Sequence, residues 1–431
     1  MDEQLLKHTA INSVALMLMV IVISIIISQY NQPIIYANGA VKQEEMVDNQ
    51  NLEGDIKNIS TLPTLESDVT KETDKLQYID NSIRQQLGDR YLIIKKSDNS
   101  FEDINIEDLY MERSISVTIK GLQGEVYDKN SILRVNQGVK FSEMPILEPE
   151  DTQETLAISN EAPIMQEITP KSIDMEITPA LNVISDPMKG LTIQYSKEEN
   201  TNLYTATIKI SLDNIYAPIL YQDEENIYIA LKRPKDVYDK IIVVDAGHGG
   251  KDSGTYSKGE QYYEKDINLS ILLYLKELLD QEDIKVYYTR TTDQTVFLNP
   301  RVKLANDVEA DFFLSIHCNA NESSVPSGTE ILYNQLDQTK GFQSKQLAQL
   351  CLEEITNITH NGNRGLAGGS EMVIIKKANM PVALSEVAFM SNQEDLEFLL
   401  KEENKKNIAG ALSKVIIRAY DEINGVDTLQ P

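Results

Sequence analysis

Two histidines and two glutamates of this chain stand at the edges of short apolar segments, and their types suit hydrolytic chemistry. His248 ends a β-branched apolar run and is flanked by glycines. Glu264 and His317 each lie at the edge of another apolar segment, and Glu386 occupies a fourth such place. Two imidazoles and one carboxylate form a ligand set of catalytic zinc sites. A further carboxylate supplies the general base that metal-assisted hydrolysis requires.

Strand and helix patterns alternate from Tyr238 onward, and this alternation predicts how the four side chains are positioned. Strands that alternate with helices favour an α/β fold, with a mostly parallel sheet covered by helices on both faces. Ligands of such sheets bind beyond the carboxyl ends of the strands. His248, His317 and Glu386 all fall at such ends, and this convergence favours one shared site. The predicted strands are 241–244, 284–288, 312–316, 330–333, 372–375 and 382–385.

Each of the four residues also has an ordinary structural interpretation. His248 has the alternative of a loop histidine satisfied by backbone groups, and His317 that of a core imidazole. Glu264 begins an amphipathic helical pattern, where a carboxylate also stabilises the helix dipole. Glu386 lies in an apolar run, where burial of an unpaired carboxylate is costly, so it needs a partner.

The composition of the 431-residue chain argues against one class of partner. The formal net charge is -27 and the pI is about 4.6, so nucleic acid is not expected, because its phosphates would be repelled. The two cysteines do not suggest a disulfide framework. Cys351 falls at helical spacing with Leu347 and Ile355 and is expected in the core. Cys318 follows His317 in a strand pattern, so its side chain is expected to point away from the metal.

The N-terminal region predicts attachment to a membrane. After a short tail, residues 1–9, the apolar segment 10–28 nearly spans a hydrocarbon core at ~1.5 Å per residue. We expect an uncleaved single-pass anchor, with a cleaved signal peptide as the alternative, because the segment exceeds the usual apolar length of such peptides. The polar stretch 29–85 is interpreted as a tether. The remainder is expected on the extracytoplasmic side of the cell membrane, or secreted if the segment is cleaved.

Residues 86–237 show mainly strand patterns. An acidic, proline-containing stretch at 143–180 interrupts them and is interpreted as a linker or long insertion. A small β-sandwich built from strands on both sides of this stretch is expected. Two roles stay open for it: binding of a cell-wall or protein ligand, and a spacer without a specific ligand. The clearest strand patterns are 91–94, 115–119, 191–195, 205–210 and 227–231.

Four motifs of the C-terminal half resemble, in the same order, those of the zinc-dependent N-acetylmuramoyl-L-alanine amidases. The resemblance covers about residues 238–424 and leaves a tail at 425–431. It implies that His248, Glu264 and His317 bind Zn²⁺ and that Glu386 is the catalytic carboxylate. The chain departs from the family at Cys318 and Ala388. The motifs are Val243-Val244-Asp245-Ala246-Gly247-His248-Gly249-Gly250, Glu264-Lys265-Asp266-Ile267-Asn268-Leu269, Ser315-Ile316-His317-Cys318-Asn319-Ala320 and Glu386-Val387-Ala388-Phe389-Met390-Ser391-Asn392.

The resemblance implies a peptidoglycan hydrolase that cleaves the amide between N-acetylmuramic acid and L-alanine. Glu386 would take a proton from the attacking water and deliver it to the departing amine. Arg364 is expected to contact a stem-peptide carboxylate or the oxyanion, with a surface arginine as the alternative. The stretch from His317 to Glu386 is expected to hold strands and one helix, without a segment that plugs the site. Two other functions stay open: a membrane-anchored wall-binding protein with an inactive hydrolase fold, and a zinc peptidase or deacetylase of the wall.

Overall fold

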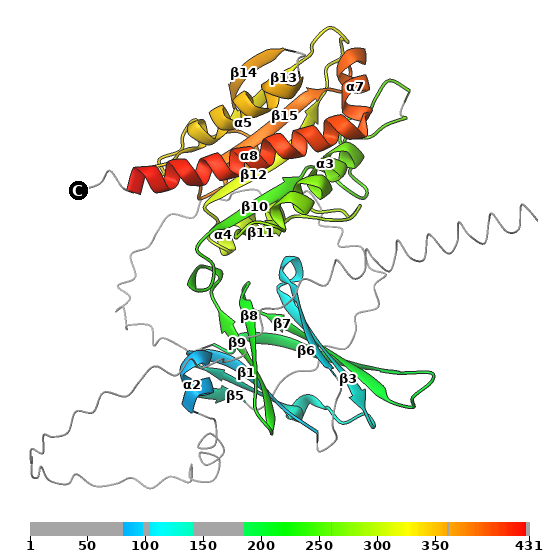
Figure 1. Ribbon diagram of the computed structural model, residues 1–431, viewed down its shortest axis with the longest axis vertical. Helices are drawn as coiled ribbons and strands as arrows, with labels where there is room; N and C mark the ends of the chain where they lie inside the picture. The colour runs from blue at the N-terminus through cyan, green and yellow to red at the C-terminus, as the bar shows by residue number, and fades with distance from the viewer. Residues whose placement is uncertain (1–80, 98–102, 142–184, 260, 360–361, 428–431) are drawn as a thin grey trace, which may run out of the picture.

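A computed structural model describes residues 81–97, 103–141, 185–259, 261–359 and 362–427, which form a mixed α/β protein (Figure 1). The predicted tail 1–9, anchor 10–28 and insertion 143–180 lie outside these residues, as does the tether 29–85 up to residue 80. Helix α2 (Asn81–Leu87) begins within the predicted tether. Within the described residues, no helix combines the length and apolar character needed to cross a membrane.

Two antiparallel sheets face each other in the N-terminal half and form the expected β-sandwich. Alternation explains its core: along β7, Ala206, Ile208 and Ile210 are fully buried, while Thr207 and Lys209 between them are not. Residues from both sheets join one apolar cluster. One sheet has the order β5 (Val139–Phe141), β4 (Ile132–Asn136), β1 (Arg90–Lys95), β9 (Asn226–Lys232) and β8 (Ala217–Gln222); the other has β2 (Asp103–Leu109), β3 (Ser114–Leu122), β7 (Tyr204–Leu212) and β6 (Met188–Lys197).

A six-stranded sheet organises the C-terminal half. Four of its strands are mutually parallel, and the remaining two run antiparallel to them while pairing in parallel with each other. The prediction of a mostly parallel sheet therefore holds for the part that carries the histidines. The strand order is β11 (Lys285–Tyr288), β10 (Ile241–Ala246), β12 (Phe312–Asn319), β15 (Val382–Phe389), β13 (Thr329–Tyr333) and β14 (Asn363–Gly368).

Helices cover both faces of this sheet, and the central strands supply apolar side chains to both layers. Along β10, Ile242 and Val244 pack toward one cluster, and Ile241 and Val243 toward the other. This is why the strand is a continuous apolar run rather than an alternating one. One layer contains α3 (Glu264–Leu279), α5 (Ser344–Thr359), α7 (Gln393–Leu400) and α8 (Glu402–Asp427); the other contains α4 (Leu298–Asp307) and α6 (Val373–Lys376).

The structure of this half differs from the sequence predictions in four details. The predicted strand 372–375 is the short helix α6, and its Ile374 and Ile375 are buried; a four-residue apolar run does not distinguish a buried helical turn from a strand. The strand β14 was not predicted, since its sequence carries two glycines and few apolar residues. Between β12 and β15 lie two helices, α5 and α6, instead of one. Helix α8 also continues to Asp427, beyond the predicted boundary at 424.

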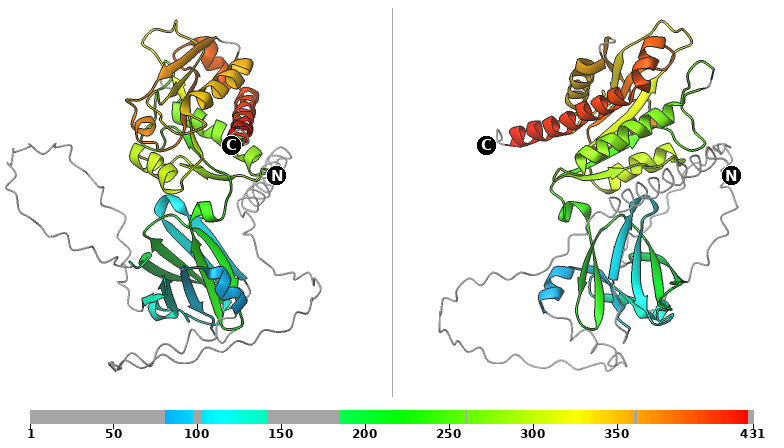
Figure 2. Two further views of the ribbon diagram at one scale, coloured as in Figure 1. Left: turned by 90° about the vertical axis from the view of Figure 1, so that its left-hand side faces the viewer. Right: turned by 45° about the vertical axis from the view of Figure 1, so that its right-hand side comes forward.

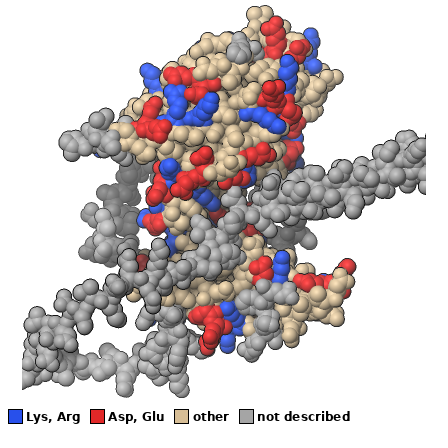
Figure 3. Space-filling model, viewed as in Figure 1, with Lys and Arg blue, Asp and Glu red and all other residues tan. Residues whose placement is uncertain are grey.

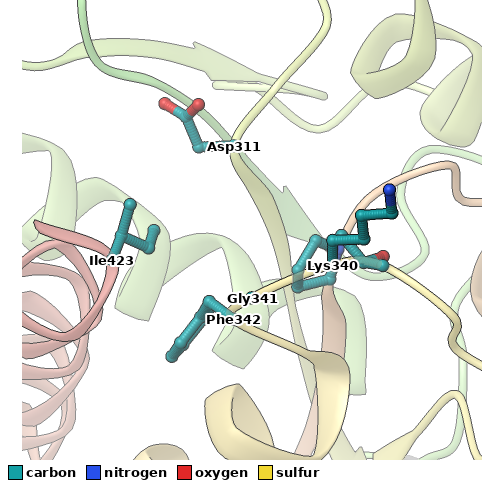
Figure 4. A pocket seen from close by; sticks show the side chains of 7 residues that line it. Asp311, Lys340, Gly341, Phe342 and Ile423 are labelled. Atoms are coloured by element: carbon teal, nitrogen blue, oxygen red, sulfur yellow. The ribbon is translucent and has the colours of Figure 1, made fainter. Parts of the chain in front are cut away.

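The two halves contact each other through the turn between β2 and β3, which reaches the side of β11 (Figures 1 and 2). In the view of Figure 3, acidic and basic side chains are interspersed over the C-terminal half. A cavity of about 170 Å³ lies beside Asp311, at the amino end of β12 and thus at the end of the strand remote from His317 (Figure 4). The Asp311 carboxylate accepts hydrogen bonds from the Ile241 N–H and the Tyr420 hydroxyl and is therefore already satisfied.

Candidate metal centre

His248 lies in the loop that follows β10, where the glycines of the motif give the chain its freedom. Its own φ is 62°, a left-handed conformation that is uncommon for a residue with a side chain and that must be held by its surroundings. The Arg301 guanidinium donates to the His248 carbonyl over 2.7 Å. The Asp252 carboxylate accepts a hydrogen bond from Nδ1 of the imidazole over 2.9 Å, which leaves Nε2 directed to Glu264 at 3.2 Å.

Glu264 is the first residue of α3, and its carboxylate is almost completely buried. Backbone amides of Thr255 and Cys318 donate to its two oxygens over 2.9 and 3.1 Å. The Asn268 side-chain amide, one helical turn further on, donates over 3.2 Å. These neutral donors orient the carboxylate, so that its oxygens also face the two imidazoles.

His317 lies on β12, next to the loop of His248. Its Nδ1 is 2.9 Å from Glu264 Oε1, and the two imidazole rings lie edge to face with centroids 4.9 Å apart. The ring fits against Gly247 so closely that a Cβ built there would be 2.2 Å from an imidazole carbon. A Cβ on Gly254 would similarly be 2.5 Å from Glu264. Gly247 and Gly254 are thus both required, because a larger residue at either position would collide with a side chain of the site.

The structure brings the three predicted ligands together. One donor atom from each of His248, Glu264 and His317 can be chosen so that all lie within 4.8 Å of one another. Two imidazole nitrogens and a carboxylate oxygen are the donors that zinc prefers in hydrolytic sites. Cys318 is not in this group: its thiol lies 3.6 Å from the Asn268 side chain, as its position on the opposite face predicts.

The three groups hold one another in a strongly polar arrangement. Burial lowers the pKa of His248, but hydrogen bonds and charge from Glu264 and Asp252 more than offset it and raise the pKa to about 9. Burial likewise opposes the protonation of His317, yet Glu264 raises its pKa. Burial raises the pKa of Glu264, but the two imidazoles hold it well below its usual range. Without a metal, the carboxylate therefore favours protonated histidines, and a cation that binds there takes the place of those protons.

Glu386 lies beside this group on β15. The parallel pairing of β12 with β15 places His317 opposite Glu386, and the antiparallel pairing with β13 places Glu330 on its other side. Among the residues that the structure describes, no group hydrogen-bonds the buried oxygen Oε2 of Glu386. Burial raises the pKa of Glu386 to about 7; the His317 and His248 charges oppose this rise, and those of Glu264 and Glu330 add to it.

Arg364 lies on β14, next to Gly365, which pairs with Glu330 of β13. Its Nε is 3.9 Å from Glu330 Oε1, and its guanidinium lies over the Phe389 ring at 4.9 Å. Its contacts place it next to Glu330 rather than within the group of metal ligands. With 38% of its side chain exposed, it is the cation at the outer end of the row His317, Glu386 and Glu330.

Sequence reasoning missed several residues that support this site. Asp252 follows the quoted glycine-rich motif by two residues, but nothing in its spacing shows that its carboxylate meets the imidazole four residues earlier. Asp245 is completely buried and accepts hydrogen bonds from Thr289, Ser315 and Arg301. A carboxylate inside an apolar strand was the signal for such a network, because it requires buried donors.

The fold and the site together define a class: a mixed α/β domain in which a His, Glu and His group suited to a metal ion lies beside a further carboxylate. Comparison with known proteins agrees. The sequence profile of the N-acetylmuramoyl-L-alanine amidase family matches residues 242–418. The chain is 34% identical over 183 residues to the uncharacterized protein YqiI of Bacillus subtilis, covering 42% of this chain and 86% of that protein. This chain therefore belongs to the N-acetylmuramoyl-L-alanine amidase family.

Two further relatives share the same region. The N-acetylmuramoyl-L-alanine amidase LytC of Bacillus subtilis is 33% identical over 190 residues, which cover 44% of this chain and only 37% of LytC. The catalytic domain of the amidase CwlV from Bacillus (Paenibacillus) polymyxa var. colistinus is 33% identical, with a TM-score of 0.40. That likeness covers 42% of this chain and 99% of the CwlV domain.

Proposed function

We propose that this protein is a zinc-dependent amidase that hydrolyses the bond between N-acetylmuramic acid and L-alanine in peptidoglycan. Membership of the family supports the reaction. The observation that carries the mechanism is the juxtaposition of three metal-ligating side chains with Glu386, whose oxygen Oε2 has no partner among the described residues. A buried carboxylate oxygen without a hydrogen-bond partner destabilises the fold if the residue is purely structural. Such an oxygen is expected where the carboxylate reacts with a substrate.

In this mechanism, His248, Glu264 and His317 would hold the zinc ion, which would supply an activated water and polarisation of the amide carbonyl. The Glu386 carboxylate accepts the proton of the attacking water and then donates it to the departing L-alanine nitrogen. A pKa of about 7 suits both steps, because the group is then able to change protonation state at neutral pH. Asp252 and the donors around Glu264 keep the ligands oriented.

Product analysis of digested peptidoglycan tests this function. An amidase releases new L-alanine amino termini, a deacetylase new amino sugars, a peptidase other amino termini, and an inactive wall-binding protein none of these. We expect new L-alanine termini from the full chain with zinc, and their loss on chelation. In His317→Ala, added zinc should not restore activity, whereas it should restore the chelated wild type. Release of other products, or activity that survives chelation, would reject the proposal.

Arg364 is proposed as a substrate-binding residue that recognises a carboxylate of the stem peptide. One side of the guanidinium faces Glu330, and its partial exposure leaves room for an acidic ligand on the other side. Arginine is suited to this role because its planar donors match a carboxylate. Its position at the outer end of the row, beyond Glu330, favours the peptide over the oxyanion as its partner.

Arg364→Ala tests this assignment against Arg418→Ala, since Arg418 has a similar exposure of 40% but pairs with Glu353 and Glu354 elsewhere. A hydrogen bond to a charged group contributes about 1.5–3 kcal/mol, so KM should rise about tenfold or more in Arg364→Ala alone. The rise should be smaller for stem peptides whose carboxylates are amidated. Equal effects on both kinds of stem would contradict the assignment.

The location of the protein is also a proposal. Peptidoglycan lies outside the cytoplasm, so the catalytic half must lie there, with residues 10–28 as a single-pass anchor and 29–85 as a spacer. Cell fractionation with N-terminal sequencing distinguishes the alternatives. An intact N-terminus in the membrane fraction supports an anchor, whereas a soluble protein that begins near Ala40 indicates a cleaved signal peptide.

A further inference from the structure

The edge strand of the catalytic sheet is closed by a side chain from the β-sandwich. Strand β11 lies at the edge of the six-stranded sheet, where backbone groups of one side have no neighbouring strand. The Tyr110 hydroxyl donates to the Tyr288 carbonyl over 3.0 Å and accepts from the Tyr288 N–H over 3.1 Å. The Tyr110 ring also meets the Tyr287 ring edge to face, at 4.9 Å between centroids. The Tyr110 side chain thus satisfies the two backbone groups of Tyr288 that a neighbouring seventh strand would otherwise bond.

This contact belongs to a larger interface made by the turn between β2 and β3, residues 108–113, here called the sandwich tip. Arg113 forms an ion pair with Asp307 of α4. Asp108 lies close enough to Lys285 of β11 for its charge to be affected, and burial raises the pKa of Asp108 to about 6. Tyr110 and Met111 pack on an apolar cluster of the catalytic half. The core of the catalytic half is therefore continuous with the sandwich tip, although the family match begins only at residue 242.

The residues that follow Tyr288 hold the loop of the metal centre. Thr289 donates to the buried carboxylate of Asp245 over 2.6 Å. Arg290 donates to the carbonyls of Ala246 and Gly247 over 2.9 and 2.8 Å. Gly247 is the residue on which the His317 ring packs, and it directly precedes His248. A displacement of the end of β11 is thus transmitted to two ligands through two buried hydrogen-bonding side chains.

We infer that the sandwich tip is a positioning element of the metal centre, with Tyr110 acting through the end of β11. The inference rests on the proposed metal-dependent function, and it assigns a task to the β-sandwich that needs no wall ligand. Tyr110 touches neither the substrate nor the metal. Its hydroxyl fixes the backbone at Tyr288, and this fixes Arg290 and the loop that carries His248. The catalytic half would then bind zinc less tightly when the tip is released.

Tyr110→Phe in the full chain tests this, because phenylalanine keeps the ring contact and removes both hydrogen bonds. Tyr195→Phe is a closely matched control. The Tyr195 hydroxyl also bonds both backbone groups of a single residue, Tyr127, over 2.5 and 2.9 Å, but within the β-sandwich. Three quantities are compared: zinc affinity against a competing chelator, the visible absorption of the Co²⁺-loaded protein, and amide hydrogen exchange at β11 and its following loop.

We expect Tyr110→Phe to weaken zinc binding roughly three- to tenfold, at or below the usual effect of removing a partner of a metal ligand. The Co²⁺ spectrum should change, exchange at residues 288–294 should accelerate, and kcat should fall with little change in KM. Tyr195→Phe should match the wild type at the metal centre. Wild-type metal binding, spectrum and exchange in Tyr110→Phe would overturn the inference, as would equal effects of both variants. If the wild type binds no zinc, the proposed function fails, whereas hydrogen exchange still decides whether Tyr110 holds β11.

Discussion

The two halves of this protein bury charge in different ways. In the described part of the β-sandwich, Arg134 is the charged residue with the least exposure, and it is paired with Asp186 at 3.2 Å. The catalytic half buries Asp245, Glu264, Arg290 and Arg301 around the predicted metal site. It also buries Asp395 in α7, where the backbone amides of Gly328 and Phe389 donate to the carboxylate. Buried charges generally stabilise a fold less than apolar residues of similar shape would. A concentration of them beside Glu386, whose Oε2 has no hydrogen-bond partner among the described residues, therefore points to function rather than to stability.

Glu386→Gln should have the largest effect of the substitutions that test whether the buried charges of the catalytic half serve function. Glutamine keeps the shape but accepts a proton poorly, so kcat should fall about 10²- to 10⁴-fold, the usual contribution of general acid–base catalysis. Zinc content should stay at the wild-type level, because Glu386 is not among the three grouped ligands. The measurements are metal analysis and the rate of release of L-alanine amino termini.

Glu330→Gln is the control, since Glu330 flanks Glu386 on the neighbouring strand. It should change the rate much less, because it only adds to the negative charge near Glu386. If Glu386→Gln keeps near wild-type activity while Glu330→Gln does not, the proton-transferring carboxylate has been assigned to the wrong residue.

Two glycine-to-alanine substitutions, one in each half of the protein, compare how tightly the two halves are packed at these positions. An alanine methyl at Gly247 would be 2.2 Å from the His317 ring, whereas one at Gly124 of the sandwich meets no atom within 4 Å. Neither glycine has a positive φ, so the backbone tolerates alanine and only the packing differs. Gly247→Ala should cost about 1–3 kcal/mol by overpacking, and zinc affinity should fall about 10- to 100-fold.

Thermal unfolding and zinc titration of both variants are the measurements. Gly124→Ala is expected to be neutral in both. A Gly247→Ala protein with normal zinc affinity would mean that the His317 ring has room to move away, and that the close fit at Gly247 does not position it.

The positions of the candidate site residues were predictable because each is marked by its own stretch of chain. His248, His317 and Glu386 follow or interrupt apolar runs, and runs that become parallel strands bring their carboxyl ends to one edge. The strands of the sandwich were predictable on similar grounds, since alternation in β3 and β7 reports which face is buried. The local sequence pattern is sufficient to predict the burial or position of a residue when the strand or helix that contains the residue determines its surroundings.

Residues whose roles depend on contacts between distant segments were not predictable. Tyr110 lies 178 positions from Tyr288, and the sequence around either residue contains no pattern that predicts their contact. The left-handed backbone of His248, in the loop after β10, is held by Arg301 of α4. Helix α6 was mistaken for a strand because tertiary packing, and not its four apolar residues, decides its conformation.

The smallest expected effect concerns the pH dependence of the metal-free protein. The pKa of His248 is about 9 in the fold, above the ordinary value of 6.5, because Glu264 and Asp252 favour its protonated form against the effect of burial. Its stabilising contribution is therefore complete below pH 6.5 and is lost as the pH rises to about 9. The lowered pKa of Glu264 sets the acidic limit of this stability. The stabilising contribution of Glu264 is complete above about pH 4.5 and is lost as the pH falls further. The metal-free site should thus be most stable between about pH 5 and 6.5.

Between pH 6.5 and 9, the free energy of unfolding of the metal-free protein should fall by about 2 kcal/mol. The rise of the His248 pKa from 6.5 to about 9 corresponds to ~3.4 kcal/mol at ~1.36 kcal/mol per pKa unit, and the partial exposure of the side chain reduces this value. Zinc removes this loss, since it requires neutral imidazoles from the start. Hydrogen exchange at pH 6.5 and 9, corrected for the intrinsic rates, locates the effect. Without zinc, protection should fall at residues 247–254 and at the start of α3, and remain unchanged in β3 and β7. An equal fall in the sandwich strands would show that the pH dependence arises from the whole fold and not from the charges gathered at the metal centre.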